Sequence, residues 1–283
     1  MNKTQVQFIL KNLEFTPKKS LGQNFLINTA VLDHILNFSD LSKKDIVLEI
    51  GAGLGALTEK LLEKCQKVYA YEIDNVLYKN LLKNLSIFNN LRLFNKDILD
   101  GKPPLCNKVI SNIPYTITGQ IFQKVFFHPN PPEGVLLIEK VIAERIFSTN
   151  EYKKFSRITI TVNSFLDPIT MIDISPESFY PCPKIKLSLI KLKPKKKNHD
   201  FLKKEHTIKF YLKFIAGIMP YKNKNIGNAI ELFLKSIKKT QITKTEIIDT
   251  LKKNNFKNDK ITKFEIHNFP ELSQIIYNLI KYA

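Results

Sequence analysis

The sequence predicts an α/β fold, with a mostly parallel sheet covered by helices on both faces, followed by a smaller all-α domain. Over the first two-thirds of the chain, short β-branched apolar runs alternate with amphipathic helical patterns, which is typical of repeated β-α units. After a lysine-rich segment at 193–200, only helical patterns follow. We therefore expect one domain at 1–194 and a second, helical domain at 195–283.

The elements expected in the first domain are short, as is usual for such folds. The expected strands span 45–50, 67–73, 91–95, 108–111, 134–139, 157–165 and 186–192, with a proline-rich loop between the last two. Helical patterns follow the first two strands at 56–64 and 75–85. In the second domain, helices are expected at 201–219, 226–238, 244–254 and 269–281.

The chain is strongly basic, with a net charge of +18 at pH 7. From Lys195 to the end, 19 lysines stand against 8 acidic residues, so most of the excess charge belongs to the expected second domain. Nucleic acids are the usual partners of such a surface, and lysine suits point-charge contacts to phosphates. Because only three of the 44 basic residues are arginine, a coding bias toward AT-rich codons remains an alternative explanation.

The sequence has no membrane or export signal. No run approaches the roughly 20 apolar residues that span a bilayer, and residues 1–19 lack the continuous apolar core of a signal peptide. Cys65, Cys106 and Cys182 lie far apart and form no C-x-x-C pair. We expect packed, reduced thiols in a cytoplasmic protein, with no bound metal and no membrane contact.

A glycine-rich loop closes the first expected strand and opens a helix. In this segment, EIGAGLG at 49–55, Gly51 and Gly53 let the backbone pass close to a ligand. The spacing also satisfies the dinucleotide fingerprint, so NAD is an alternative, as is a turn formed for packing alone. A pyrophosphate disfavours a nearby carboxylate, whereas a sulfonium amino acid tolerates Glu49. The loop therefore favours S-adenosylmethionine.

Acidic residues follow the next two strands. Glu72 ends the second strand, where a carboxylate can accept hydrogen bonds from both hydroxyls of a ribose. Asp97 follows the third strand and can accept a hydrogen bond from an adenine amine. Both positions suit the adenosine part of the cofactor.

The segment SNIPY at 111–115 follows the fourth strand, at the edge where open α/β sheets bind ligands. Adenine N6 is a poor nucleophile because its lone pair is delocalised. The Asn112 side-chain oxygen and the Ile113 carbonyl can accept both amine hydrogens and draw the nitrogen toward a tetrahedral form. Pro114 fixes the turn, and Tyr115 offers a face for a flipped base. A simple turn after a strand is the alternative; after such a cofactor loop, the motif indicates methylation of an amine conjugated to a ring or carbonyl.

Four segments occur in order: KSLGQNFL at 19–26, the loop at 49–55, NIPY at 112–115 and FYPCPK at 179–184. Together they resemble the ribosomal RNA adenine dimethyltransferase family, over nearly all of the first domain and more weakly in the second. The resemblance implies a Rossmann-like domain that uses S-adenosylmethionine. It also implies N6,N6-dimethylation of two adjacent adenosines in a hairpin loop near the 3′ end of 16S ribosomal RNA during small-subunit assembly. We expect a monomer.

By resemblance, residues from several segments would hold the cofactor, Gly53 of the glycine loop among them. Asn24 and Leu26 would touch it, and Gly51 would lie against its methionine part. Glu72 would hold the ribose, and Asp97 would meet the adenine.

By the same resemblance, Asn112 would line both the cofactor and the target base, and Phe179 would close the pocket over that base. A core aromatic before a proline turn is the alternative for Phe179. In the second domain, Lys222 and Lys224 are the candidate contacts to RNA phosphates.

The sequence departs from the family at two places. The family usually has a glutamate after the lysine of its Gln-Lys-Glu segment, whereas Val141 follows Lys140. The family's arginine-rich helix becomes the segment 222–228, with a glycine where an arginine is common. Neither departure affects the expected chemistry, but both bear on the contacts to RNA.

Three alternatives compete with this interpretation. The macrolide-resistance branch of the same superfamily dimethylates an adenine in 23S ribosomal RNA; the segment LGQNFL at 21–26 favours the small-subunit enzyme. A non-catalytic RNA-binding assembly factor could retain the fold, but the intact Asn112 and Tyr115 argue against that as its only role. An oxidoreductase would leave the Asn-Ile-Pro-Tyr segment unexplained.

Overall fold

The computed structural model describes residues 1–148 and 155–282, which form two compact units. The α/β unit comprises Met1–Phe126, Pro131–Ala143 and Pro168–Pro194. The helical unit comprises Phe127–Asn130, Glu144–Asp167 and Lys195–Ala283. The chain passes from the α/β unit to the helical unit for the last time between Pro194 and Lys195. The two earlier segments of the helical unit were expected in the first domain, because their sequences look like parts of a sheet.

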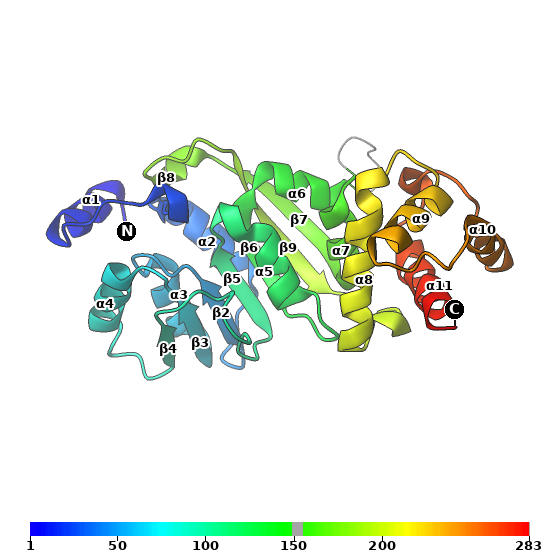
Figure 1. Ribbon diagram of the computed structural model, residues 1–283. Helices are drawn as coiled ribbons and strands as arrows, with labels where there is room; N and C mark the ends of the chain where they lie inside the picture. The colour runs from blue at the N-terminus through cyan, green and yellow to red at the C-terminus, as the bar shows by residue number, and fades with distance from the viewer. Residues whose placement is uncertain (149–154, 283) are drawn as a thin grey trace. The chain divides into compact units, whose positions relative to one another are not determined.

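A seven-stranded sheet forms the centre of the α/β unit, in the order β4-β3-β2-β5-β6-β9-β7 (Figure 1). Its strands are β2 (Ile46–Ile50), β3 (Lys67–Tyr71), β4 (Leu91–Phe94), β5 (Lys108–Asn112), β6 (Glu133–Glu139), β7 (Leu166–Ile174) and β9 (Leu187–Pro194). Strands β2 to β6 pair in parallel, and β9 runs antiparallel to β6. The α/β class with a parallel sheet is confirmed.

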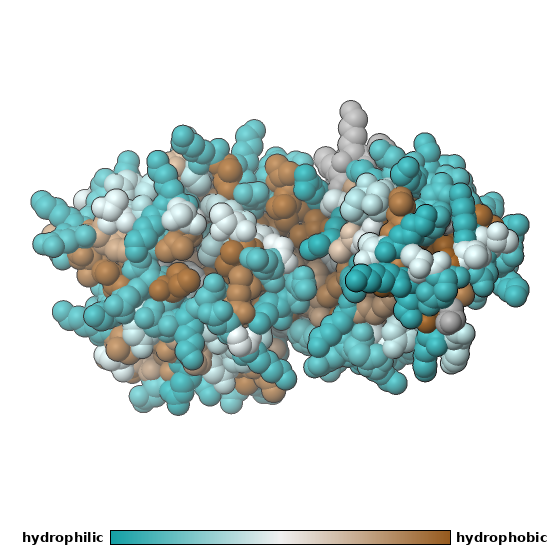
Figure 2. Space-filling model, in the orientation of Figure 1, coloured by the Kyte–Doolittle hydropathy of each residue, from teal (hydrophilic) through white to brown (hydrophobic). Residues whose placement is uncertain are grey.

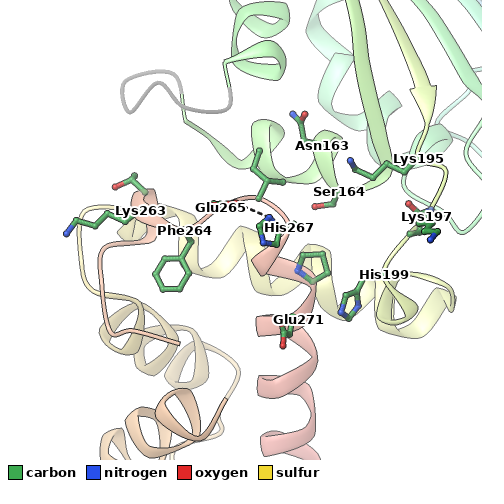
Figure 3. A pocket seen from close by; sticks show the side chains of 14 residues that line it. Asn163, Ser164, Lys195, Lys197, His199, Lys263, Phe264, Glu265, His267 and Glu271 are labelled. Atoms are coloured by element: carbon green, nitrogen blue, oxygen red, sulfur yellow. Dashed lines mark ion pairs between the residues drawn. The ribbon is translucent and has the colours of Figure 1, made fainter. Parts of the chain in front are cut away.

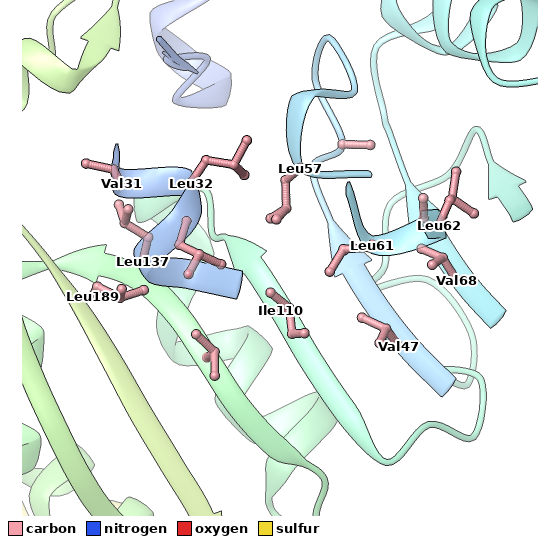
Figure 4. Packing of buried hydrophobic residues seen from close by; sticks show 14 of the residues in the cluster. Val31, Leu32, Val47, Leu57, Leu61, Leu62, Val68, Ile110, Leu137 and Leu189 are labelled. Carbon is pink, nitrogen blue, oxygen red and sulfur yellow. The ribbon is translucent and has the colours of Figure 1, made fainter. Parts of the chain in front are cut away.

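Helices and a short second sheet complete this unit. The helices are α1 (Lys3–Asn12), α2 (Thr29–Phe38), α3 (Ala56–Lys64), α4 (Asn75–Asn84), α5 (Thr118–Ile121) and the start of α6 (Lys140–Phe147). Strands β1 (Phe25–Leu26) and β8 (Phe179–Tyr180) pair antiparallel. Apolar side chains of α2 and α3 pack on the sheet, with Leu61 and Val47 fully buried (Figure 4). This packing fixes the strand ends that carry the site.

Helix α1 was not expected, because residues 1–19 show no strong helical pattern. Its start is nonetheless encoded locally: the Asn2 side chain accepts a hydrogen bond from the Gln5 backbone, and the Gln5 side chain accepts one from Asn2. This reciprocal cap satisfies two free backbone donors. Val6 and Leu10 are buried and anchor the helix.

The strand expected at 157–165 is wrong: this segment is α7 (Arg157–Phe165), and the strand β7 follows it within the expected loop. A capping box between Ser156 and Thr159 starts the helix, and the Thr161 hydroxyl donates to the Arg157 carbonyl at 3.0 Å. Most of the helix is buried, and apolar or β-branched residues therefore occupy several of its faces. Periodicity cannot distinguish such a helix from a buried strand.

The helical unit also contains α8 (Glu205–Ile218), α9 (Ile226–Ser236), α10 (Lys244–Lys253) and α11 (Asn268–Tyr282), close to the expected bounds. Its core is aromatic: Tyr211, Phe214 and Phe233 are buried, and the rings of Phe214 and Phe233 meet edge to face at 5.3 Å. Within residues 1–148 and 155–282, no helix has the length and apolar character to cross a membrane.

Candidate active site

The site is built at the carboxyl ends of β2 and β5, which are neighbours in the sheet. The strand order changes direction beside β2, since β3 lies on one side of it and β5 on the other, and ligands of open α/β sheets bind at such points. The Ser111 hydroxyl on β5 donates to the Ile50 carbonyl on β2 at 2.6 Å. Both residues are buried, so the two loops that follow these strands start from fixed positions.

The loop after β2 requires glycines because its backbone has positive φ and because a Cβ would lie too close to neighbouring side chains. Gly53 has φ 59°, and a Cβ there would lie 3.3 Å from the Phe25 ring. Gly55 has φ 88° at the start of α3, and a Cβ there would lie 2.8 Å from Leu81. Other residues would be strained at both positions. Packing therefore explains part of the glycine pattern, and the loop also borders a pocket.

Glu72, the expected ribose ligand, holds this loop in place. Its Oε2 accepts a hydrogen bond from the Gly53 backbone at 2.8 Å, and its Oε1 accepts one from Asp74 at 2.9 Å. The side chain is buried, and burial raises the pKa of its carboxyl despite these bonds. Each carboxylate oxygen can accept a further hydrogen bond, so capacity for a ribose hydroxyl remains.

Asn112 ends β5 with one side of its amide bound and the other unbound. Its Nδ2 donates to the Asn24 backbone carbonyl at 3.3 Å, which orients the side chain. Its Oδ1 is buried and has no hydrogen-bond partner in the described part of the chain. Buried polar atoms are nearly always paired in native proteins, so an exception of this kind indicates a place for a ligand.

The two aromatic residues of the expected site lie in a shared apolar cluster. Tyr115 packs partly buried against it, and its hydroxyl is buried without a partner among the described residues. Burial, with a smaller effect of Glu139, raises the pKa of the Tyr115 hydroxyl above its usual range. Phe179 is 2% exposed, and its strand pairs with β1, opposite Leu26. Phe179 is therefore a core side chain in this structure, next to the segment that carries Asn24.

Five expected cofactor residues line one narrow pocket of about 60 Å³. Glu49 also lines it, buried, and its Oε2 has no partner among the residues described. A pocket with two unpartnered acceptor oxygens suits a ligand that carries hydrogen-bond donors and positive charge, as the methionine part of S-adenosylmethionine does. The pocket is lined by Met1, Asn24, Phe25, Leu26, Ile35, Glu49, Gly51, Ala52, Gly53, Leu54, Ala56, Leu57 and Asn112.

Two acidic residues differ from expectation in whether they line the narrow pocket. Asp97 does not line this pocket; its Oδ1 accepts a hydrogen bond from the Leu99 backbone at 2.9 Å. Glu49 does line it, although the sequence suggested only that it discriminates between cofactors. The sequence signal for a direct role was its position two residues before Gly51, near the end of a strand that is buried from Val47 to Ile50.

A mostly parallel sheet with a glycine-rich loop and a pocket at the point where the strand order changes direction is the architecture of the Rossmann-like S-adenosylmethionine-dependent methyltransferases. A family model described as ribosomal RNA adenine dimethylase matches residues 14–267, and the chain belongs to this family. The protein is thus an enzyme that dimethylates adenine in ribosomal RNA with S-adenosylmethionine as its cofactor. The nicotinamide alternative is set aside.

Known proteins agree with this assignment. A ribosomal RNA small subunit methyltransferase A of Borrelia garinii is 34% identical over 237 residues, covering 82% of each chain. The crystal structure of a dimethyladenosine transferase from Plasmodium falciparum has a TM-score of 0.74 at 24% identity and covers 91% of this chain and 98% of that one. The 23S rRNA methyltransferase ErmE has a TM-score of 0.61 at 22% identity, covering 91% and 100%. The two structural likenesses show the fold.

The two lysines proposed to hold RNA lie in different environments. Lys224 is exposed, whereas Lys222 is half-buried and its Nζ donates to the Phe155 carbonyl at 3.0 Å. The nearby Gly227, where the family commonly has arginine, donates its backbone N–H to Asn258 Oδ1 at 2.9 Å. A Cβ at Gly227 would lie 3.0 Å from that oxygen, which explains the glycine locally.

A larger pocket of about 1050 Å³ lies within the helical unit, between the linker that carries Lys195 and His199, the loop before α11, and the end of α7 (Figure 3). Its charges are mixed. Lys195 pairs with Asp167 at 2.7 Å, and Lys263 pairs with Asp259 at 3.3 Å. The face of the molecule in Figure 2 is largely hydrophilic over this unit, without a concentrated apolar patch. The pocket does not by itself define a ligand.

Proposed function

We propose that the enzyme dimethylates the N6 amines of two adjacent adenosines in a hairpin loop near the 3′ end of 16S ribosomal RNA, during assembly of the small subunit. The small-subunit assignment draws support from the resemblance of residues 19–26 and 179–184, and from the names of curated relatives such as the Borrelia garinii protein. The cytoplasm, as expected from the cysteine pattern, is the compartment where this reaction would occur.

The observation that carries the proposal is the unpartnered Oδ1 of Asn112. Because Nδ2 is bound to the Asn24 carbonyl, Oδ1 is the atom that can accept a hydrogen bond from a ligand. An amine hydrogen bound there would draw N6 toward a tetrahedral form and expose its lone pair. A preoriented acceptor of this kind gains strength as positive charge develops on the nitrogen in the transition state.

The neighbouring residues have complementary roles in the proposal. The Ile113 carbonyl accepts the second amine hydrogen, and the face of Tyr115 stacks on the flipped base. Phe179 packs in the cluster that supports Tyr115, and we propose that its ring also limits the pocket over the base. After the first transfer one amine hydrogen remains, so the pocket must accept an N6-methyl group before the second.

The cofactor supplies an electrophilic methyl group on its sulfonium. We propose that Asn24, Leu26, Gly51 and Gly53 hold its methionine end in the narrow pocket that they line. Glu72 would accept hydrogen bonds from the ribose.

Asp97, outside this pocket, would accept one from the adenine amine. A small pocket suffices for the methionine end alone, and the adenosine would extend beyond it toward these two acids.

We propose that residues 195–283 bind RNA through their lysines, among them Lys222 and Lys224. The charge of this segment supports a phosphate-directed, sequence-independent contribution to affinity. We propose that the enzyme acts as a monomer, since Asn112, Tyr115 and Phe179 all belong to the same compact unit.

Mapping the methylated bases tests this function. The enzyme would be incubated with labelled S-adenosylmethionine and either partly assembled small subunits or 23S ribosomal RNA. Label at two adjacent adenosines near the 3′ end of 16S ribosomal RNA is the expected result. Label confined to 23S ribosomal RNA would favour the macrolide-resistance activity, and label in neither would contradict both assignments.

A further inference from the structure

Glu49 is a buried carboxyl group in the wall of the narrow pocket, and its Oε2 has no hydrogen-bond partner in the part of the chain that the structure describes. It lies on β2, two residues before Gly51, and is 2% exposed. Leaving a buried carboxylate ionised without donors is costly, so a group in this position holds its proton unless a positive charge comes near.

The two buried carboxyls near the glycine loop differ in what they bind. Glu72 accepts hydrogen bonds from two backbone donors, which favour its ionised form. Glu49 has only the neighbouring Thr58 hydroxyl to favour ionisation. Burial, together with the charge of Glu72, raises the pKa of Glu49 to about 8. Burial raises the pKa of both carboxyls, and Glu49 has fewer hydrogen-bond donors than Glu72 to offset that effect.

The polar and charged groups around Glu49 in the described part of the chain come from three elements. Glu72 follows β3, Thr58 lies on α3, and Asn112 at the end of β5 lines the same pocket. The buried Lys108 at the start of β5 is bound to the Ser39 and Asp40 carbonyls and to Asp45. Among the described residues that line the pocket there is no lysine, arginine or histidine. Met1 lines it, so the ammonium group at residue 1 is the other titratable group to control for.

The cofactor and its product differ by one positive charge at this place. S-adenosylmethionine carries a sulfonium and an ammonium, whereas S-adenosylhomocysteine keeps only the ammonium beside its carboxylate. We infer that Glu49 is a specificity-determining residue that ionises when the sulfonium cofactor binds and takes up a proton again when the neutral thioether product remains. The proton passes to solvent on cofactor binding and returns from solvent after methyl transfer.

This coupling makes the pocket discriminate between cofactor and product. Below the pKa of free Glu49, each unit of rising pH strengthens cofactor binding by up to about tenfold, because one proton is released per cofactor bound. Binding of the product changes less over the same range. The inference rests on the proposed placement of the methionine end in this pocket.

Calorimetry in two buffers of different ionisation enthalpy, at pH 7, measures the protons released. For the wild-type protein we expect S-adenosylmethionine to release close to one proton more than S-adenosylhomocysteine. In Glu49→Gln the two ligands should release equal numbers, while any contribution of Met1 stays the same in both proteins. Equal release by both ligands in the wild type, or a difference that persists in Glu49→Gln, would overturn the inference.

The wild-type comparison keeps the test decisive if Glu49→Gln does not fold. Dissociation constants of both ligands would then be measured between pH 6 and about 9. If the dissociation constants of both ligands change with pH in the same way, the role of Glu49 is contradicted and the placement of the cofactor is not. If the protein binds neither ligand, the placement of the cofactor is contradicted as well.

Discussion

The α/β unit and the helical unit differ in how they hold the polar groups proposed to be functional. In the α/β unit, buried polar atoms of Glu49, Asn112 and Tyr115 have no hydrogen-bond partner among the described residues. In the helical unit, charged groups such as Lys195 and Lys263 are paired with acids on the protein surface. We propose that the fixed geometry of the buried site serves methyl transfer and that the surface charge of the helical unit serves affinity for RNA. The comparison predicts that changes in the two units will alter different measured quantities.

The largest expected effect is that of Asn112→Ala on methyl transfer. Removing one preoriented hydrogen-bond partner of a transition state typically lowers the rate by about 100- to 1000-fold. Single-turnover assays with saturating cofactor measure this step. Asn84→Ala, at an exposed helical asparagine, is the matched control and should transfer at the wild-type rate. Near wild-type transfer by Asn112→Ala would remove the proposed acceptor.

A smaller effect is expected at Tyr115, where ring and hydroxyl can be separated. Tyr115→Ala removes a stacking face worth roughly 1–3 kcal/mol, so RNA should bind or react more weakly by that amount. Tyr115→Phe keeps the ring and removes a hydroxyl that has no partner within the described chain, so it should stay largely active. If Tyr115→Phe proved as inactive as Tyr115→Ala, the hydroxyl rather than the ring would be the functional group.

Glu72→Ala should weaken cofactor binding by roughly 1–3 kcal/mol, because a charged hydrogen-bond partner is lost. The structure adds a second expectation, a lower melting temperature, since Glu72 also holds the Gly53 and Asp74 backbones. Calorimetry and thermal unfolding measure the two effects. Glu63→Ala, at an exposed residue, controls for loss of a carboxylate. Unchanged cofactor affinity in folded Glu72→Ala would refute its role as ribose ligand.

The smallest effects are expected from changes at Lys222 and Lys224, and they concern RNA affinity. Reversing Lys222 and Lys224 to glutamate should flatten the salt dependence of RNA binding and leave cofactor binding intact. Lys224→Glu alone should lower the slope by about one phosphate contact. Lys222→Glu should also reduce stability, because it loses the bond to the Phe155 carbonyl. Lys102→Glu, exposed in the α/β unit, is the control. If the double change left the salt dependence of RNA binding unaltered, the lysine excess of residues 195–283 would be explained by coding bias instead.

The sequence predicted those candidate site residues whose positions depend on local backbone geometry. Gly51 and Gly53 lie in the turn that follows β2, and Asn112 is the last residue of β5. The pocket brings them together with Asn24 and Leu26. Local order along the chain sufficed here, because the carboxyl ends of parallel strands share one edge of the sheet.

The remaining features depend on tertiary burial, which periodicity does not report. Helix α7 looked like a strand because its β-branched residues are buried on several sides. Phe179 could not be assigned to the core from its motif, and Glu72 could not be seen to brace the loop. The unpaired oxygen of Glu49 is visible only once its neighbours are known.

The division of labour between the units is tested most directly by measuring two quantities on the same two variants. Asn112→Ala and Lys224→Glu would each be assayed for RNA affinity at several salt concentrations and for single-turnover methyl transfer at saturating RNA and cofactor. We expect Asn112→Ala to lose transfer rate with nearly unchanged RNA affinity, and Lys224→Glu to lose affinity with unchanged transfer rate. The account would be contradicted if Asn112→Ala mainly weakened RNA binding while Lys224→Glu slowed the saturated chemical step.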